Sequence, residues 1–284
     1  MLTLPTAADM RRWSDAERRA GRTIGFVPTM GALHHGHASL IRAARTACDR
    51  VVVSIFVNPT QFGPTEDFGR YPRTFDADRA LCERDGADAV FAPSVEDMYP
   101  PGGETFVDVG PLGAVLCGAS RPGHFRGVAT VVAKLFAIVT PHRAYFGQKD
   151  YQQTVVIRRL ALDLRLGIDI VVCPTVRDAD GLAASSRNAY LTPEERKLAL
   201  QVPAALAEAG RLIAAGERSG GKIRHALEVF LTNAPGVRVD YAAVVHPDTL
   251  QPLERLAGRV VVALAVRVGN TRLIDNGVFE VHDA

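Results

Sequence analysis

The sequence predicts an α/β fold, with a doubly wound parallel sheet in the first part of the chain and a second, smaller α+β part after it. Up to about residue 175, short runs rich in β-branched residues alternate with segments of helical character, as in successive strand–helix units. One of these runs, 51–57, is apolar at every position except Ser54, which is typical of a strand buried on both faces. Beyond Val176 the pattern changes to longer helical segments followed by strands.

In the first part of the chain, strands and helices are expected to alternate. We expect strands at 23–27, 51–57, 89–91, 144–146 and 168–173, and helices at 38–44, 76–85, 128–139 and 150–164. In sheets of this kind, ligands bind beyond the carboxyl ends of the strands, where the strand order reverses. The loops that follow the strands are therefore the expected place for a functional site.

The second part opens with a clear signal for the start of a helix. Thr192 is a preferred N-cap residue, Pro193 suits the first helical position and Glu195 completes a capping box. Pro203 is expected to kink the long helix that follows, because proline lacks the N–H that a helix interior needs. The glycines of 216–221 are expected to form a flexible break.

The remaining residues are expected to complete an α+β unit. A further helix is predicted near 222–231, and strands at 237–245 and 259–268. These roughly one hundred residues match a usual domain size. We therefore divide the chain into a nucleotide-binding domain at 1–175 and a smaller C-terminal domain at 176–284.

Composition and charge narrow the class of protein. The 284 residues carry a formal net charge of +2, so neither nucleic acid nor a membrane surface is an expected partner. The chain has no long uncharged apolar run, and its first 22 residues lack the apolar core of a secretion signal. The four widely spaced cysteines lie in or beside apolar segments and are expected to be buried thiols of a reducing compartment. These cysteines are Cys48, Cys82, Cys117 and Cys173. A cytoplasmic location is therefore expected.

The loop after the first strand carries the pattern His34-His35-Gly36-His37 and leads directly into a helix. A helix N-terminus offers unpaired N–H groups and the positive end of the helix dipole, so it attracts phosphate. Gly36 would let a ligand approach the backbone, and two imidazoles at this spacing suit a nucleotide whose phosphates are attacked or expelled. Alone, the motif could also cap a surface turn. A zinc site is disfavoured, since no CxxC or HExxH pattern accompanies it.

Polar residues follow two other predicted strands. Asn58 and Gln61 come after 51–57, and their amides could orient hydroxyl and carboxylate groups. The segment 146–153 repeats the strand–glycine–helix arrangement, with Lys149 as a charge suited to phosphate. Taken singly, the first could be an ordinary Asn-Pro turn and the second a solvated first turn of a helix.

A hydroxyl-rich segment after the last predicted strand could bind a polyphosphate. Ser185, Ser186 and Arg187 follow one another directly, and a guanidinium binds phosphate through paired N–H groups. A polar linker between domains is the simpler interpretation of this segment alone. The chain lacks the GxxxxGK[ST] loop, since Gly220-Gly221-Lys222 is followed by Ile223, and it has neither a GxGxxG loop after the first strand nor a GxSxG elbow.

Five segments together resemble the pantothenate synthetase family, and they occur in the order typical of that family. They are PTMGALHHGH at 28–37, FVNPTQFGPTEDFGRYPRT at 56–74, RPGHFRGVATVVAKLF at 121–136, FGQKDYQQ at 146–153 and DGLAASSRNAYLT at 180–192. The last ninety residues add little to this resemblance.

The resemblance implies an ATP-dependent ligase that joins pantoate to β-alanine through a pantoyl adenylate and releases AMP and pyrophosphate. It implies a Rossmann-like first domain of the nucleotidyltransferase type, a smaller C-terminal domain acting as a lid, a homodimer, and Mg²⁺ held through the ATP phosphates. No protein ligand to a metal is assigned. A carboxylate is a poor electrophile, so its activation needs positioning and charge stabilisation more than a nucleophilic side chain.

The resemblance also assigns roles to individual residues. His37 would be the proton donor, and the other catalytic residues would be His34, Lys149, Ser185, Ser186 and Arg187. The ATP site would comprise Met30, Gly31, Ala32, Leu33, His34, His35, Gly36, His37, Gly147, Gln148, Lys149, Asp150, Val176, Ala184, Ser185, Ser186 and Arg187. Pantoate and β-alanine would be bound by Gln61, Gln153, Asn58 and Tyr71.

Two positions depart from the family pattern. Ala184 stands where members often have Met or Leu, which would leave a wider adenine pocket, and Ala137 stands where Asn is expected.

The sequence is also compatible with other functions. A nucleotidylyltransferase acting on a phosphorylated acceptor would share the HxGH motif and its use in phosphate binding. It would need a basic pocket for the acceptor phosphate, however, rather than the amides of Asn58 and Gln61. A non-catalytic nucleotide-binding module could dispense with the phosphate-binding groups that are present here. A tRNA-charging enzyme is disfavoured by the near-neutral charge and by the absence of an anticodon-binding extension.

Overall fold

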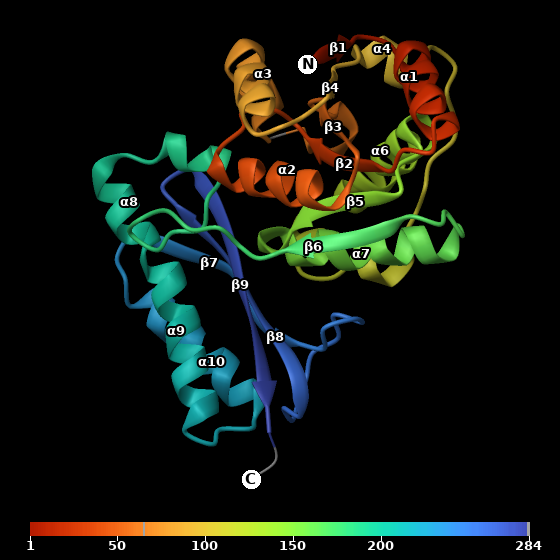
Figure 1. Ribbon diagram of the computed structural model, residues 1–284. Coiled ribbons are helices and arrows are strands. Elements are labelled where there is room, and N and C mark those ends of the chain that lie inside the picture. The colour runs from red at the N-terminus through yellow and green to blue at the C-terminus, as the bar shows by residue number, and fades with distance from the viewer. Residues whose placement is uncertain (65, 283–284) are drawn as a thin grey trace.

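The first part of the chain forms a parallel sheet. The computed structural model describes residues 1–64 and 66–282. Within this range, six strands pair in parallel in the order β1-β4-β3-β2-β5-β6 (Figure 1). The strands are β1 (Leu2–Leu4), β2 (Ile24–Thr29), β3 (Arg50–Ile55), β4 (Ala89–Phe91), β5 (Arg143–Gly147) and β6 (Asp169–Cys173).

The strand order reverses between β2 and β5, which confirms the doubly wound fold. From β2 the chain proceeds outward through β3 to β4, and it later returns to β5 on the other side of β2 before reaching β6. β2 and β5 pair directly, with Gly25 opposite Arg143. The loops that leave β2 and β5 therefore diverge at the same edge of the sheet and leave a crevice between them.

Helices cover both faces of this sheet. On one face, α1 (Ala7–Arg19), α6 (His124–Val139) and α7 (Tyr151–Asp163) contribute to one apolar cluster. On the other face, α2 (His35–Ala47) and α3 (Phe75–Arg84) contribute to a second cluster. The short helices α4 (Val95–Met98) and α5 (Cys117–Ser120) and the 3₁₀ turns η1 (Pro59–Gln61), η2 (Asp67–Arg70), η3 (Gly110–Gly113), η4 (Gln148–Asp150) and η5 (Ser186–Tyr190) lie in the connections.

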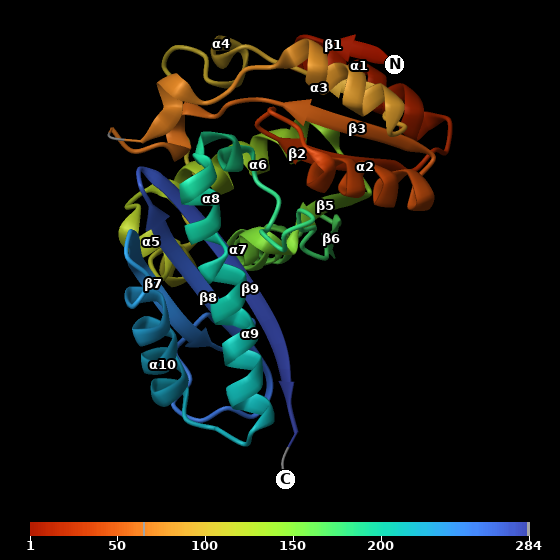
Figure 2. The same cartoon turned by 90° about the vertical axis from the view of Figure 1, so that its left-hand side faces the viewer.

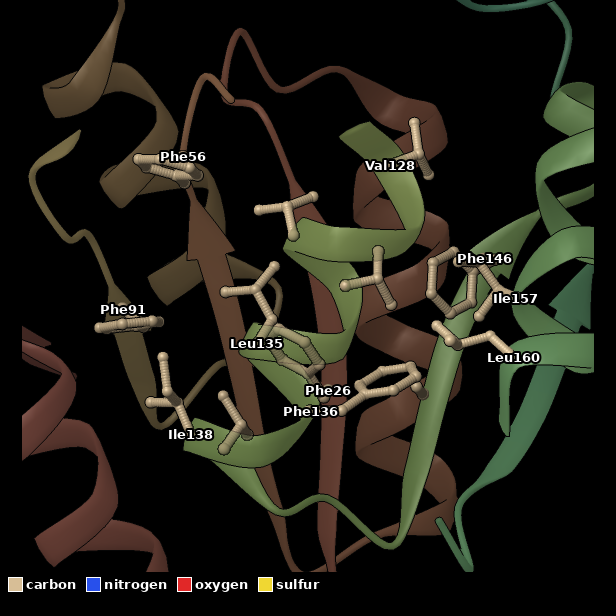
Figure 3. Packing of buried hydrophobic residues seen from close by; sticks show 14 of the residues in the cluster. Phe26, Phe56, Phe91, Val128, Leu135, Phe136, Ile138, Phe146, Ile157 and Leu160 are labelled. Carbon is tan, nitrogen blue, oxygen red and sulfur yellow. The ribbon is translucent and has the colours of Figure 1, made fainter. Parts of the chain in front are cut away.

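The centre of the first apolar cluster is aromatic. Phe136 of α6 lies between Phe26 of β2 and Phe146 of β5, with edge-to-face ring centroids 6.4 and 6.5 Å apart (Figure 3). All three side chains are buried, and burial of each contributes about 1.5–3 kcal/mol. Because α6 is anchored here, its N-terminal end is held at the carboxyl edge of the sheet. The helix predicted at 128–139 is thus confirmed, and it begins four residues earlier.

The second part of the chain is a three-stranded antiparallel sheet with helices against one face (Figure 2). Its described strands are β7 (Val237–Val245), β8 (Gly258–Val268) and β9 (Thr271–Val281), and its helices are α8 (Pro193–Ala199), α9 (Gln201–Ala214) and α10 (Gly220–Thr232). α9 and α10 pack against this sheet through a shared apolar cluster. The expected smaller α+β part is therefore confirmed as a fold class, whereas the boundary at 175/176 stays a prediction.

β8 joins the two parts of the molecule because both of its faces are buried. Val260 and Val262 belong to the cluster beneath α9 and α10. Val261 and Ala263, on the opposite face, pack with Tyr151 of α7 in the first part. The alternate residues of one strand thus fill two separate interfaces.

The second part differs from expectation in three places. The helical run is interrupted at Leu200, one turn before Pro203, rather than at the proline itself, because Pro203 has no N–H to bond the Ala199 carbonyl. Gly220 and Gly221 begin α10 instead of extending the break, because Ser219 caps that helix. The strand β9 was not expected. Its polar residues interrupt the apolar pattern.

The structure also bears on composition-based expectations. The four cysteines are free thiols and buried, as expected. Among the helices of the described residues, none is both long and apolar enough to cross a bilayer.

Candidate active site

The loop after β2 is held in an unusual backbone conformation. Thr29 donates a hydrogen bond from Oγ1 to the Ser54 carbonyl (2.6 Å) and accepts one from the Gly31 N–H (3.1 Å). Gly31 and Ala32 then adopt φ of 82° and 51°. Ala32 bears a Cβ, for which this region is uncommon, so the conformation needs support from the surroundings.

Asp78 of α3 supplies that support, and sequence reasoning missed it. Its buried carboxylate accepts hydrogen bonds from the backbone N–H of Ala32 (2.9 Å) and of Leu33 (2.7 Å), and a third from Thr74 Oγ1 (3.1 Å). Two orphan N–H groups are thereby satisfied by one charged acceptor. Nothing in the local pattern distinguishes Asp78 from the exposed Asp76 in the same first turn of α3.

His34 and His37 lie together at the start of α2. His34 Nδ1 accepts from the Gly36 N–H, and His37 Nδ1 accepts from the His34 N–H, both at 3.2 Å. The ring centroids are 4.1 Å apart. Because Nδ1 of each ring is an acceptor, the proton of each neutral ring is on Nε2. Both rings line the cavity described below, as potential N–H donors.

Both imidazoles are neutral near pH 7. Burial, followed by the nearby charge of Lys149, lowers the pKa of His34 to about 4. Burial, with His34 and Lys149 beside it, holds the pKa of His37 well below its usual value. Two neutral N–H donors beside a lysine ammonium suit a polyanion, whose negative charge would in turn raise both pKa values.

The amide residues after β3 have different environments. Asn58 is buried, and its Nδ2 donates to the Gly127 carbonyl (3.2 Å) and to Gln61 Oε1 (3.1 Å). Its Oδ1 accepts from the Tyr99 hydroxyl (2.9 Å). Asn58 thus braces the turn. Both residues line the cavity, and Gln61 Nε2 lies 2.9 Å from Met30 Sδ.

The segment that leaves β5 brings Lys149 to the edge of the crevice opposite the histidines. Lys149 Nζ lies 3.9 Å from the Asp150 carboxylate. A Cβ built on Gly147 meets no atom within 4 Å, so this position borders open space. Gln148 differs from its neighbours, because its side chain contacts Asn276 of β9 (3.4 Å) and does not line the cavity.

The segment 185–187 meets the loop that follows β3. The Arg187 guanidinium binds the Asp67 carboxylate through two hydrogen bonds of 2.9 and 3.1 Å. The hydroxyls of Ser186 and Tyr71 are 3.3 Å apart. The backbone N–H of Arg187 also donates to Ser185 Oγ (3.3 Å), which caps the 3₁₀ turn η5. Arg187 therefore already has an anionic partner, which an incoming phosphate would have to displace.

These loops enclose a cavity of about 230 Å³ at the switch point. It adjoins a larger cavity of about 490 Å³ between the two parts of the chain, lined in common by Lys149 and Arg187. The expected site residues that line the smaller cavity are Met30, His34, Gly36, His37, Asn58, Gln61, Tyr71, Gly147, Lys149, Asp150, Gln153, Val176, Ala184, Ser185, Ser186 and Arg187.

Other expected residues lie outside the cavity lining. These are Gly31, Ala32, Leu33, His35 and Gln148. The first three shape the loop, and the half-exposed ring of His35 instead approaches Asp178, with Nε2 3.3 Å from the carboxylate. Ala184 lies beside Gly36. A Cβ added to Gly36 would be 3.5 Å from the Cβ of Ala184, so a longer side chain at position 184 would fill part of the space between them.

Arg121 and His124 are two further residues at the cavity that were not assigned a role. Arg121 binds both oxygens of Glu66 at 2.6 Å. His124 Nδ1 donates to the Gln61 carbonyl (2.8 Å), so its Nε2 accepts from Arg121 Nη1 (3.0 Å). Burial and Arg121 lower the pKa of His124 to about 4. The RPGHF segment at 121–125, which contains both residues, was the available signal.

The fold and this cavity define a class. A doubly wound sheet with an HxGH loop at its switch point, a lysine across the crevice and an arginine beyond it is the arrangement of a Rossmann-like nucleotide-dependent transfer enzyme.

Comparison with known proteins gives the family. The family model described as pantoate-beta-alanine ligase matches residues 3–278, so the chain belongs to that family. A pantothenate synthetase from Moorella thermoacetica is 60% identical over 283 residues, covering 100% of both chains. One from Heliobacterium modesticaldum is 56% identical, covering 99% of this chain and 100% of that protein.

Solved structures agree with the family. The crystal structure of pantothenate synthetase from Thermus thermophilus matches with a TM-score of 0.93 and 49% identity over 100% of both chains. A pantoate-beta-alanine ligase from Francisella tularensis, complexed with beta-gamma ATP and beta-alanine, matches with a TM-score of 0.79 and 34% identity. That match covers 100% of this chain and 99% of the other.

Proposed function

We propose that this protein is an AMP-forming ligase that uses ATP to condense (R)-pantoate with β-alanine to pantothenate. The observation that carries the proposal is one cavity at the switch point, lined by the neutral imidazoles of His34 and His37, the ammonium of Lys149 and the amides of Gln61 and Gln153. Phosphate-binding and carboxylate-orienting groups thus face the same space. Membership of the pantoate-beta-alanine ligase family supports it.

The first step would be activation of pantoate. A pantoate carboxylate oxygen attacks the α-phosphorus of ATP, the bond to the bridging oxygen breaks, and pyrophosphate leaves with that electron pair. The Nε2–H groups of His34 and His37 and the Lys149 ammonium would stabilise the charge that develops on the phosphates. Ser185, Ser186 and Arg187 would receive the pyrophosphate, with Arg187 exchanging Asp67 for it.

The second step would be amide formation. The β-alanine amine attacks the acyl carbon of pantoyl adenylate, the bond from that carbon to the phosphate oxygen breaks, AMP leaves with the electron pair, and the amine proton passes to solvent. Gln61, Gln153 and Tyr71 would orient the substrates within the same cavity. Water must be kept away from the mixed anhydride during this step. The C-terminal part would exclude it by covering the crevice as a lid.

ATP and magnesium would enter together. We propose that ATP binds with its adenosine beside Gly147, Asp150, Val176 and Ala184, and that Mg²⁺ is held through its phosphates, since this ion usually keeps few protein ligands in phosphate-transfer sites. Within the described residues, no group of three or more His, Cys, Asp or Glu is arranged to hold a metal ion. The ion would neutralise charge on the leaving pyrophosphate.

Assembly and location remain proposals from the family resemblance. We propose that the chain works as a homodimer in the cytoplasm. Light scattering at micromolar concentration is expected to give twice the 30.6 kDa chain mass. A mass of one chain would contradict the dimer.

Pyrophosphate release from Mg·ATP tests the proposed reaction directly. Release should depend on pantoate, with an enzyme-bound acyl adenylate that β-alanine converts to pantothenate and AMP. A folded sample that binds ATP without pantoate-dependent release would overturn the proposal and direct attention to phosphorylated acceptors.

A variant of His37 gives the matching prediction for the site. His37→Ala should slow adenylate formation by more than about tenfold, the low end of what a positioned proton donor contributes. His225→Ala, on the exposed face of α10, serves as the control and should leave the rate unchanged. A normal rate in the His37 variant would remove this residue from the mechanism.

A further inference from the structure

Asn276, in the middle of β9, directs its whole side chain at the segment that carries Lys149. Its Nδ2 donates to the backbone carbonyls of Gln148 and of Lys149, both at 2.9 Å. Its Oδ1 accepts from Gln148 Nε2 at 3.4 Å. The side chain is buried, so these contacts are protected from water, and their loss would remove one donor from each of the two carbonyls.

The neighbouring residue of β9 binds the segment that follows β6. Asp275 is buried and binds Arg177 through hydrogen bonds of 2.6 and 3.2 Å, and Arg177 also donates to the Gly181 carbonyl (3.1 Å). Two consecutive residues of the C-terminal strand therefore hold the segments that carry Lys149 and Val176. Both segments border the cavity.

The Lys149 segment has little support of its own. It forms the 3₁₀ turn η4, which has no side-chain cap, and α7 after it also begins without one. The lysine side chain has four flexible carbons, so the place of Nζ depends on where the backbone is fixed. The Asn276 amide fixes that backbone by binding two successive carbonyls.

We propose that Asn276 is a positioning residue for Lys149, through which the C-terminal part of the chain sets the phosphate-binding charge of the active site. This proposal rests on the proposed function for its catalytic consequence. Asn276 does not line the smaller cavity in which the phosphates and the acyl group would lie. Its effect should therefore appear only where the Lys149 ammonium acts, in nucleotide phosphate binding and in the adenylation step.

A double-mutant cycle tests this proposal, because coupled residues give non-additive losses. The four proteins are the wild type, Asn276→Ala, Lys149→Ala and the double variant. The first readout is the dissociation constant of a non-hydrolysable ATP analogue with Mg²⁺. Asn276→Ala should weaken binding by about fivefold or more in the wild-type background and by less than about twofold in the Lys149→Ala background.

The second readout separates the two half-reactions. Asn276→Ala should slow pantoate-dependent pyrophosphate release by about tenfold or more, while conversion of preformed pantoyl adenylate by β-alanine changes by less than about twofold. Asn233→Ala, at the exposed end of α10, is the matched control and should behave as the wild type. Asn276→Asp keeps the shape but replaces the donor by a carboxylate facing two carbonyls, so it should be at least as impaired as Asn276→Ala.

The outcomes distinguish the two proposals. Equal losses in both Lys149 backgrounds would mean that Asn276 merely supports the fold, and wild-type behaviour of Asn276→Ala would also overturn its role. If the wild type lacks pantoate-dependent release but the binding cycle is non-additive, the proposed function fails and the positioning role stands. Thermal melts select a temperature at which every variant is folded, and Asn276→Asp takes the place of Asn276→Ala in the cycle if the latter does not fold.

Discussion

At the scale of single residues, the loop between β2 and α2 depends on one carboxylate. Asp78 accepts from the N–H groups of Ala32 and Leu33, at the point where Ala32 has positive φ. Helix α2 and its two histidines follow directly. The acidic side chain of α3 therefore determines where the imidazoles lie.

Removing this carboxylate should cost stability and activity together. Asp78→Ala leaves two N–H groups without their acceptor, so the free energy of unfolding should fall by about 2–4 kcal/mol. Urea denaturation measures this loss, and pyrophosphate release should fall with it. Asp76→Ala, at an exposed site in the same turn, should change stability by less than about 0.5 kcal/mol. Equal effects of the two substitutions would contradict the role of Asp78.

Partly buried neutral histidines should make the protein sensitive to mild acid. The pKa values of His34 and His124 are lowered to about 4, against about 6.5 in the unfolded chain. Between these values the unfolded state binds more protons, so stability rises with pH and is lost as pH falls from about 6.5 towards 4. Each such histidine should account for about 2 kcal/mol between pH 7 and pH 5.

Urea unfolding at pH 7, 6 and 5 measures this loss. The interval lies above the usual carboxylate pKa values, so the histidines dominate it. His124→Gln keeps a donor for the Gln61 carbonyl and an acceptor for Arg121, and should lose less stability on acidification. His225→Gln, on an exposed surface, should keep the wild-type slope. Stability that is constant from pH 7 to pH 5 would contradict these pKa values.

The side chains that would contact the substrates were easier to predict than the side chains that position them. His34, His37 and Lys149 follow predicted strands, and their side chains have an evident use for phosphate. Asp78 and Asn276 act on backbone groups far along the chain. Such contacts depend on the tertiary arrangement, which no local pattern records.

At the scale of elements, α6 fixes the turn that carries Gln61. Gly127 of α6 lies so close to η1 that an added Cβ would be 2.3 Å from the Thr60 carbonyl oxygen and 2.8 Å from the Gln61 nitrogen. Asn58 bridges the same two elements through the Gly127 carbonyl. The helix and the turn can therefore approach only because residue 127 has no side chain.

Substitution of this glycine should impair pantoate binding selectively. Gly127→Ala must push the backbone of η1 away, so the KM for pantoate should rise by about tenfold or more, while the affinity for the ATP analogue changes by less than about threefold. Steady-state kinetics and calorimetric titration measure the two quantities. Gly221→Ala, in α10, has space for a methyl group and should be neutral or stabilising. An equal loss of both affinities would contradict a local effect on the turn.

At the scale of elements, the continuous apolar run of β3 was recognised as a strand, whereas β9, whose apolar residues are interrupted by polar ones, was not. The strand at 51–57 became β3, shortened to Arg50–Ile55, because its apolar run left little ambiguity. β9 was missed, since Asp275 and Asn276 stand where a strand pattern requires apolar residues. Both are buried because they bind the crevice segments. The break in the pattern therefore marks a function of the strand.

At the scale of the whole molecule, the sheet of the second part is buried on both sides. One face packs against α9 and α10, while the other, through Val261 and Ala263, packs with Leu250 of the β7–β8 loop against Tyr151 of α7. Tyr151 also donates from its hydroxyl to the Pro247 carbonyl (3.1 Å). The same helix α7 begins next to Lys149. An apolar interface of this kind should couple the stability of the two parts.

The two parts should therefore unfold in one transition. Differential scanning calorimetry should give a single peak whose calorimetric and van 't Hoff enthalpies agree. Val261→Asp places an unpaired charge in the shared interface, costs several kcal/mol and should lower the melting temperature of the entire chain. Val229→Asp, at an exposed position of α10, should leave it nearly unchanged. If Val261→Asp produced a second, lower transition and left the rest at the wild-type temperature, the two parts would be independent, and β9 could not hold the crevice segments as a rigid element.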